Sequence, residues 1–98
     1  MKTLEEIQDA LSLAKYELLE RYHVNQIGVF GSRVRQDGTP ISDVDILVEF
    51  DQPVGWEIVD LHIFLEQLLD VKVDLVTKGA VIRKPLLWQS IQEDLIYV

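Results

Sequence analysis

Hydrophobic residues recur at helical spacing over the first twenty or so positions. Between Thr3 and about Tyr22 they stand three or four places apart, with acidic residues between them, at Leu4, Ile7, Leu11, Ala14, Leu18 and Leu19. This spacing predicts one amphipathic helix. Thr3, followed three residues later by Glu6, is typical of a capping box at its start.

The rest of the chain alternates between strand-like and helix-like segments. Residues 26–31 are short and β-prone, and residues 43–50 and 71–77 alternate along the chain with the period of two that a strand requires. A loop rich in Gly, Pro and Ser covers residues 36–42. Residues 56–69 and 83–93 are predicted helices, since Pro85 suits a first helical turn, and residues 95–98 are a predicted edge strand. The order α-β-β-α-β-α(-β) predicts an α/β (α+β) fold with a mixed sheet of three or four strands flanked by helices.

The helix predicted over residues 56–69 carries more hydrophobic positions than one core-facing stripe needs. We assign one stripe to the core: Ile58, Leu61, Leu65 and Leu68. Trp56, Val59 and Ile63 fall on a neighbouring flank rimmed by charged and polar residues. Either the core wraps far enough to bury this flank, or it is an exposed surface for a protein partner.

Length and composition are those of one small cytoplasmic domain. The chain has 98 residues, of which 48% are hydrophobic and 27% charged, so residues 1–98 are expected to form a single domain. No apolar run is long enough to span a membrane, and cysteine is absent. A net charge of −8 argues against direct binding to nucleic acid, whose affinity depends on Lys and Arg. The acidity fits a solvated surface and attraction to a basic partner equally well.

Three aspartates interrupt predicted strands. Asp43 and Asp45 are two residues apart, so their carboxylates leave the same face of the strand about 6.6 to 7 Å apart. Such acids repel each other unless a cation joins them, and their hard oxygens suit Mg²⁺. Asp74 interrupts another strand and would complete a site for two metal ions if the two strands are neighbours. An exposed polar strand face is the alternative for each.

A Gly-Ser pair precedes these acids at the end of the first strand. Gly31 lets a backbone approach closely, and free N–H groups at the start of the following turn favour a phosphate. Ser32 can add a hydroxyl hydrogen bond, and Arg33 and Arg35 can neutralise phosphate charge. A Gly-Ser turn alone most often means only a turn. Neither histidine has ligand spacing to the acids, so we interpret His23 as a helix-terminal residue and His62 as an ordinary helix residue.

The conjunction of these motifs resembles a known family. Gly31-Ser32, ten residues, then Asp43-Val44-Asp45 is similar to the GSx10DxD signature of the DNA polymerase beta nucleotidyltransferase superfamily, and the small size resembles its minimal nucleotidyltransferase (MNT) family. The resemblance implies a single nucleotidyltransferase domain with ATP as substrate. It implies that Asp43, Asp45 and Asp74 hold Mg²⁺, with Asp74 also the base, and that Gly31, Ser32, Arg33 and Arg35 hold the nucleotide phosphates.

The resemblance also implies a partner. MNT proteins resemble antitoxins encoded beside a HEPN-domain ribonuclease toxin, to a tyrosine of which they transfer AMP. Two alternatives stay open: neutralisation of the partner by binding alone, and transfer to a small molecule in a cleft formed by a homodimer. One departure concerns the loop, since Val34 and Gln36 stand where many members have Ala and Gly. The acids and the Gly-Ser pair are intact, so the signature predicts an active enzyme.

Overall fold

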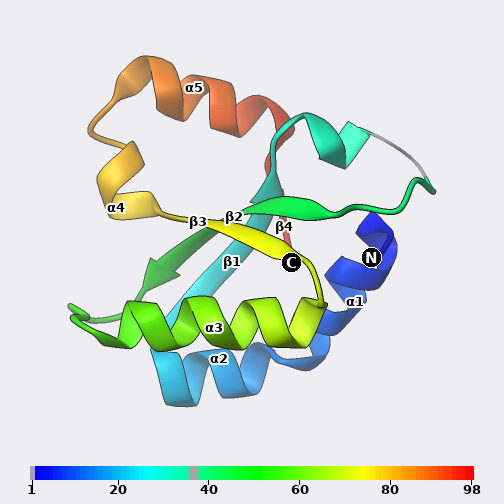
Figure 1. The fold of residues 1–98 in the computed structure, drawn as a ribbon. Coiled ribbons are helices and arrows are strands. Elements are labelled where there is room, and N and C mark those ends of the chain that lie inside the picture. Colours follow the sequence, from blue (N-terminus) through cyan, green and yellow to red (C-terminus); the bar gives the residue numbers. More distant parts are fainter. Residues whose placement is uncertain (1, 36–37) are drawn as a thin grey trace.

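A four-stranded mixed sheet runs through the middle of the molecule and carries helices on both faces (Figure 1). The computed structural model describes residues 2–35 and 38–98, without the side chain of Arg35. The strands are β1 (Val24–Phe30), β2 (Asp43–Phe50), β3 (Lys72–Thr77) and β4 (Ile96–Tyr97). Their order is β3-β2-β1-β4, with β2 and β3 parallel and the other neighbours antiparallel. The predicted fold class is confirmed, and so is the short last strand.

The helices form two layers, one on each face of the sheet. They are α1 (Leu4–Leu13), α2 (Lys15–Tyr22), α3 (Glu57–Leu69), α4 (Lys78–Val81) and α5 (Pro85–Asp94), and a 3-10 turn η1 (Ser32–Arg35) follows β1. In Figure 1, α1, α2 and α3 lie below the sheet, and α4 and α5 lie above it. Pro85 stands in the first turn of α5 as predicted. None of the described helices is both long and apolar enough to cross a membrane.

The first predicted helix is in fact two, which corrects the single helix expected over residues 3–22. Ala14 adopts φ −92° and ψ 1° between α1 and α2, a departure from helical geometry. The bend keeps Leu11 and Leu18, on either side of it, fully buried against the sheet. No Gly or Pro marks this position, so tertiary packing and not local sequence sets the break. The predicted capping box is present, with Glu6 N donating to Thr3 Oγ1 at 3.2 Å.

Alternation along β2 divides its apolar residues between two cores. Val44, Ile46 and Val48 join the larger core beneath α1, α2 and α3. Leu47 points to the other face, into a smaller core formed with Val81 and Ile91 under α4 and α5. Period-two alternation therefore places Asp43 and Asp45 on the α5 side of the sheet, beyond the end of the smaller core.

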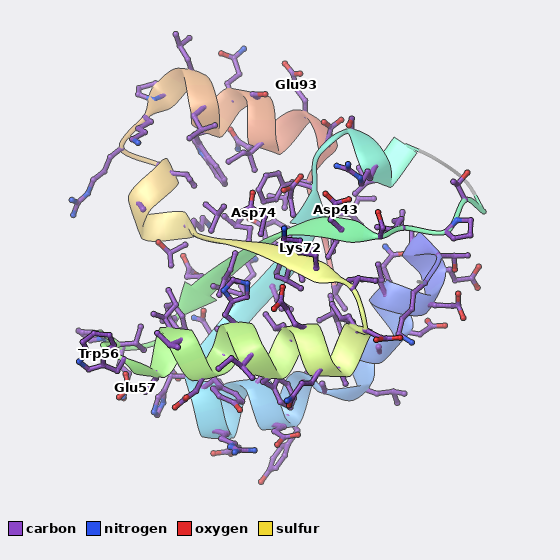
Figure 2. All side chains as sticks on the ribbon, viewed as in Figure 1. Asp43, Trp56, Glu57, Lys72, Asp74 and Glu93 are labelled. Atoms are coloured by element: carbon purple, nitrogen blue, oxygen red, sulfur yellow. The ribbon has the colours of Figure 1, made fainter. Side chains whose placement is uncertain are left out.

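The second flank of α3 is exposed. Leu61 and Leu65 are fully buried, as predicted, whereas Trp56, Val59 and Ile63 expose 87%, 46% and 50% of their surface. Trp56 projects from the start of α3 at the edge of the molecule (Figure 2). The larger core therefore does not wrap around this flank, so its exposure is confirmed, and its use as a surface for a protein partner stays a prediction.

Substitutions on the two sides of α3 should differ greatly in their effect on stability. Leu61→Ala should lower the free energy of unfolding by about 2–5 kcal/mol, because it opens a cavity in the larger core. Ile63→Glu should change it by no more than ~0.5 kcal/mol, because the side chain already meets water. Urea unfolding followed by circular dichroism measures both. Unfolding of the isolated protein by Ile63→Glu would show that the flank is part of the core.

Candidate functional site

Two acidic strands lie side by side at the site. β2 and β3 are parallel and in a register that sets Asp45 opposite Asp74 and Asp43 opposite Lys72. All four residues share one face, since each pair of opposed residues in neighbouring strands points the same way. Figure 2 shows the labelled side chains of Asp43, Lys72 and Asp74 gathered across these two strands. The neighbouring strands required for Asp74 to join the first two acids are therefore present.

The carboxyl group of Asp45 is perturbed by its surroundings. Its pKa is raised above the ordinary value, first by burial and then by the charge and hydrogen bonding of Asp74. Asp43 adds to the rise, and the guanidinium of Arg33 opposes it. The site therefore holds more negative charge than its surroundings compensate, and a cation bound between Asp45 and Asp74 would relieve that repulsion.

Gly31 makes room for the Asp45 carboxylate. The φ angle of Gly31 is +91°, a conformation that favours glycine. A Cβ atom added to it would collide with Oδ2 of Asp45. Phe30, the last residue of β1, lies opposite Asp45 in the antiparallel pairing of β1 and β2. The position of the Asp45 carboxylate therefore requires a glycine at the first position of the Gly-Ser pair.

The turn after Gly31 brings the predicted phosphate-binding residues to the same place. Val34 is buried and donates its N–H to the Gly31 carbonyl at 3.3 Å, which anchors η1 on the domain. Ser32 is exposed at the start of that turn. Arg33 Nε lies 2.8 Å from Asp43 Oδ1, so this cation lies beside the acids. The backbone of Arg35 belongs to η1, but its side chain, like residue Gln36, lies outside the described part of the chain.

The three aspartates do not converge on a single point in this arrangement. Within residues 2–35 and 38–98, no three His, Cys, Asp or Glu side chains surround one position where an ion could sit. Asp43 is turned instead toward Arg33. The donor chemistry nevertheless suits Mg²⁺, because two carboxylates already face each other beside a hollow of about 240 Å³ lined by Asp43, Asp45, Lys72 and Asp74. For Asp43 to join them, its ion pair with Arg33 must open.

His62 and Glu66 hold the strand that carries Asp74. They are four residues apart on α3, and both reach the backbone of Val73: His62 Nε2 donates to the carbonyl at 2.7 Å, and Glu66 Oε2 accepts from the N–H at 2.8 Å. His62 lies within α3 as expected, and its contact with the backbone of β3 is a feature that the sequence did not predict. The helical spacing of His62 and Glu66 was visible in the sequence, but their partner is a backbone, which side-chain patterns do not reveal.

Comparison with known proteins assigns this arrangement to a class and then to a family. A Gly-Ser turn, two acids on the next strand and a third acid on its parallel neighbour match the arrangement that the nucleotidyltransferase signature predicts, and similarity to known proteins shows that the chain is an enzyme of that class. The profile of the nucleotidyltransferase domain family matches residues 11–98. The chain belongs to this family and to its minimal nucleotidyltransferase branch.

Several relatives match over their full length. A protein of Methanocaldococcus jannaschii, provisionally described as a protein adenylyltransferase, is 50% identical over 99 residues, covering 100% of both chains. A second protein from this organism with the same description is 44% identical over 99 residues, again covering 100% of both. The protein adenylyltransferase MntA of Thermococcus cleftensis is 43% identical over 99 residues, covering 100% of this chain and 98% of the relative.

Solved structures share the fold. A chain provisionally described as a minimal nucleotidyltransferase superposes with a TM-score of 0.67 at 29% identity, covering 94% of this chain and 88% of the other. A chain from the complex of tri-AMPylated HEPN toxin of Shewanella oneidensis with MNT antitoxin gives a TM-score of 0.61 at 24% identity, covering 93% of this chain and 70% of that one. The second likeness establishes the fold alone.

Asp45→Asn should stabilise the protein at neutral pH and have no such effect in acid. At neutral pH Asp45 is a carboxylate in the unfolded chain, and only the folded state bears the cost of burying that charge beside Asp74. As the pH falls through the raised pKa of Asp45, the folded protein binds a proton before the unfolded chain, whose ordinary value is 3.8, and stability rises. At a pH below both pKa values Asp45 is protonated in both states, and the folded protein no longer bears the cost of a buried charge. Urea unfolding of the wild type and the variant at pH 7 and at about pH 3 tests this. The same difference in free energy of unfolding at the two pH values would contradict it.

Removal of the Glu66 carboxylate should free the Val73 amide. In Glu66→Leu the N–H loses its acceptor, so hydrogen exchange at Val73 should accelerate and stability should fall by about 1 kcal/mol. Glu66→Gln is the matched control, because it keeps an oxygen at the same reach and should protect Val73 nearly as well. Exchange measured by NMR separates the variants. Equal protection in wild type and Glu66→Leu would mean that β3 is held by other contacts.

Proposed function

We propose that this chain is a protein adenylyltransferase antitoxin, which transfers AMP from ATP to a tyrosine of a HEPN-domain toxin. The observation that carries the proposal is the pairing of Asp45 with Asp74 next to the Gly31-Ser32 turn. Full-length similarity to protein adenylyltransferases supports AMP as the transferred group and a protein as the acceptor. The fold shared with an antitoxin that is seen in complex with an AMPylated HEPN toxin supports the partner.

The chain's own residues supply most of what the transfer needs. The acceptor hydroxyl oxygen attacks the α-phosphorus of ATP, the new O–P bond forms as the bond to the bridging oxygen breaks, and pyrophosphate leaves with the electron pair. Asp74 takes the proton of the hydroxyl. Ser32 and the N–H groups of its turn bind the departing phosphates. Mg²⁺ held by Asp43, Asp45 and Asp74 would neutralise the phosphate charge during the reaction.

Arg33 has two partners in this scheme. Without nucleotide its guanidinium neutralises Asp43 at 2.8 Å. When ATP binds, Arg33 is released to the phosphates, and Asp43 becomes available as the third carboxylate. Arg35 stands two residues further along the same turn and is proposed to add a second cation for the phosphates, at a position where its side chain lies outside the described structure.

Loss of any of the three carboxylates should stop or greatly slow transfer without unfolding the protein. We expect Asp43→Asn and Asp45→Asn to reduce AMP transfer to background, and Asp74→Asn to slow it ~10²- to 10⁴-fold through loss of the base. Transfer is measured by incubation of the chain with ATP, Mg²⁺ and the HEPN partner, followed by intact-mass spectrometry of the partner. Mg²⁺ should raise the melting temperature of the wild type and not that of Asp45→Asn.

A matched control separates this effect from a general change of charge. Asp9→Asn removes one exposed acid from α1, on the other face of the sheet, and should keep full activity. If Asp45→Asn neutralises the toxin and modifies it as the wild type does, the metal site is assigned wrongly. Neutralisation without any AMP on the toxin, in wild type and variants alike, would establish binding alone as the mechanism.

A further inference from the structure

Lys72 is a cation at the acidic end of the sheet. It has no role in the AMP transfer proposed for Asp43, Asp45, Asp74 and the Gly31-Ser32 turn. It lies opposite Asp43 in the pairing of β2 with β3, two residues before Asp74 and on the same face. Its side chain is exposed and lines the same hollow as the three aspartates. Figure 2 shows it labelled between Asp43 and Asp74.

The ammonium group of Lys72 has no ion pair or hydrogen bond among the described residues. Two other cations on this side of the sheet do have partners: Arg33 contacts Asp43 at 2.8 Å, and Lys78 lies 3.6 Å from Glu49 and 3.4 Å from Gln26. An ammonium without such a partner is free to contact a substrate. The chain has nine Lys and Arg against 17 Asp and Glu. A surplus of basic residues therefore does not explain the unpaired cation at this position.

The order of the strands indicates on which side of the reacting phosphorus atom Lys72 lies. The Gly31-Ser32 turn follows β1, and Lys72 and Asp74 are on β3, with β2 and its two acids between them. In an in-line displacement the leaving group and the attacking oxygen stand on opposite sides of the phosphorus. If the pyrophosphate leaves over the β1 side, the acceptor oxygen arrives over β3, where Asp74 and Lys72 lie about 6.6 to 7 Å apart along the strand.

We propose that Lys72 is a catalytic residue on the acceptor side, which binds the attacking oxygen of the acceptor tyrosine as that oxygen loses its proton to Asp74. This inference rests on the proposed function and assigns a contact within it. The ammonium of Lys72 offsets the negative charge that develops on the phenol oxygen, which acidic surroundings would otherwise destabilise. Lys72 makes no contact with ATP in this arrangement.

The test compares binding of nucleotide with transfer to the acceptor. We expect Lys72→Gln to bind a non-hydrolysable ATP analogue with Mg²⁺ as tightly as the wild type, by titration calorimetry, and to transfer AMP about 100-fold more slowly to the HEPN partner. Difluorotyrosine at the acceptor position forms its phenolate more readily. The deficit of Lys72→Gln relative to wild type should therefore shrink with that acceptor.

Lys78→Gln is the matched control, since it removes the same charge from the same side of the sheet at the far end of β3. It should transfer AMP at the wild-type rate. A loss of nucleotide affinity in Lys72→Gln would make Lys72 a ligand of ATP and overturn the proposal, as would unchanged transfer or a deficit that is the same for both acceptors. A wild-type protein that transfers no AMP would instead refute the proposed function, and the role of Lys72 with it.

Discussion

Electrostatic repulsion between Asp45 and Asp74 is the constraint around which the rest of the site is arranged. The parallel register of β2 and β3 sets these residues opposite each other, and burial of Asp45 raises its pKa and worsens the conflict. A fold selected for stability alone has no reason to keep two such acids together. Gly31 gives the Asp45 carboxylate its space, Arg33 compensates Asp43, and α3 holds the backbone beside Asp74. Each of these features accommodates the same unfavourable charge, which a bound cation would turn into a favourable one.

Much of this arrangement follows from local patterns in the sequence. Period-two alternation located β2 and β3 and set Asp43, Asp45 and Asp74 on strands, and the Gly-Ser pair located the turn after β1. Helical spacing placed Leu61 and Leu65 of α3 correctly in the core and separated them from the exposed flank. Ile58 and Leu68, assigned to the same stripe, are only partly buried, whereas Leu69 is fully buried and was not predicted. Such predictions succeed because an element buried on one face has hydrophobic residues that recur with the period of a strand or a helix.

The features that escaped prediction depend on contacts between distant segments. The bend at Ala14 has no sequence marker, since it reflects how α1 and α2 fit the sheet. The contacts of His62 and Glu66 with Val73 join a helix to a backbone, and backbone groups are identical at every residue. The ion pair of Arg33 with Asp43 spans the loop between β1 and β2. Sequence spacing brought both residues to the site, but it favoured phosphate and metal as their partners and did not anticipate that they would satisfy each other.

The hold of α3 on Val73 has a consequence for how the protein meets other chains. β3 is the outermost strand of the sheet, and an outermost strand with unpaired backbone groups is a template on which another extended chain can assemble. With the N–H and C=O of Val73 both engaged, the template is interrupted near the start of the strand. Pairing of a strand from another chain with the edge strand that carries Asp74 is thereby made less favourable. A partner is then expected to contact this enzyme through side chains.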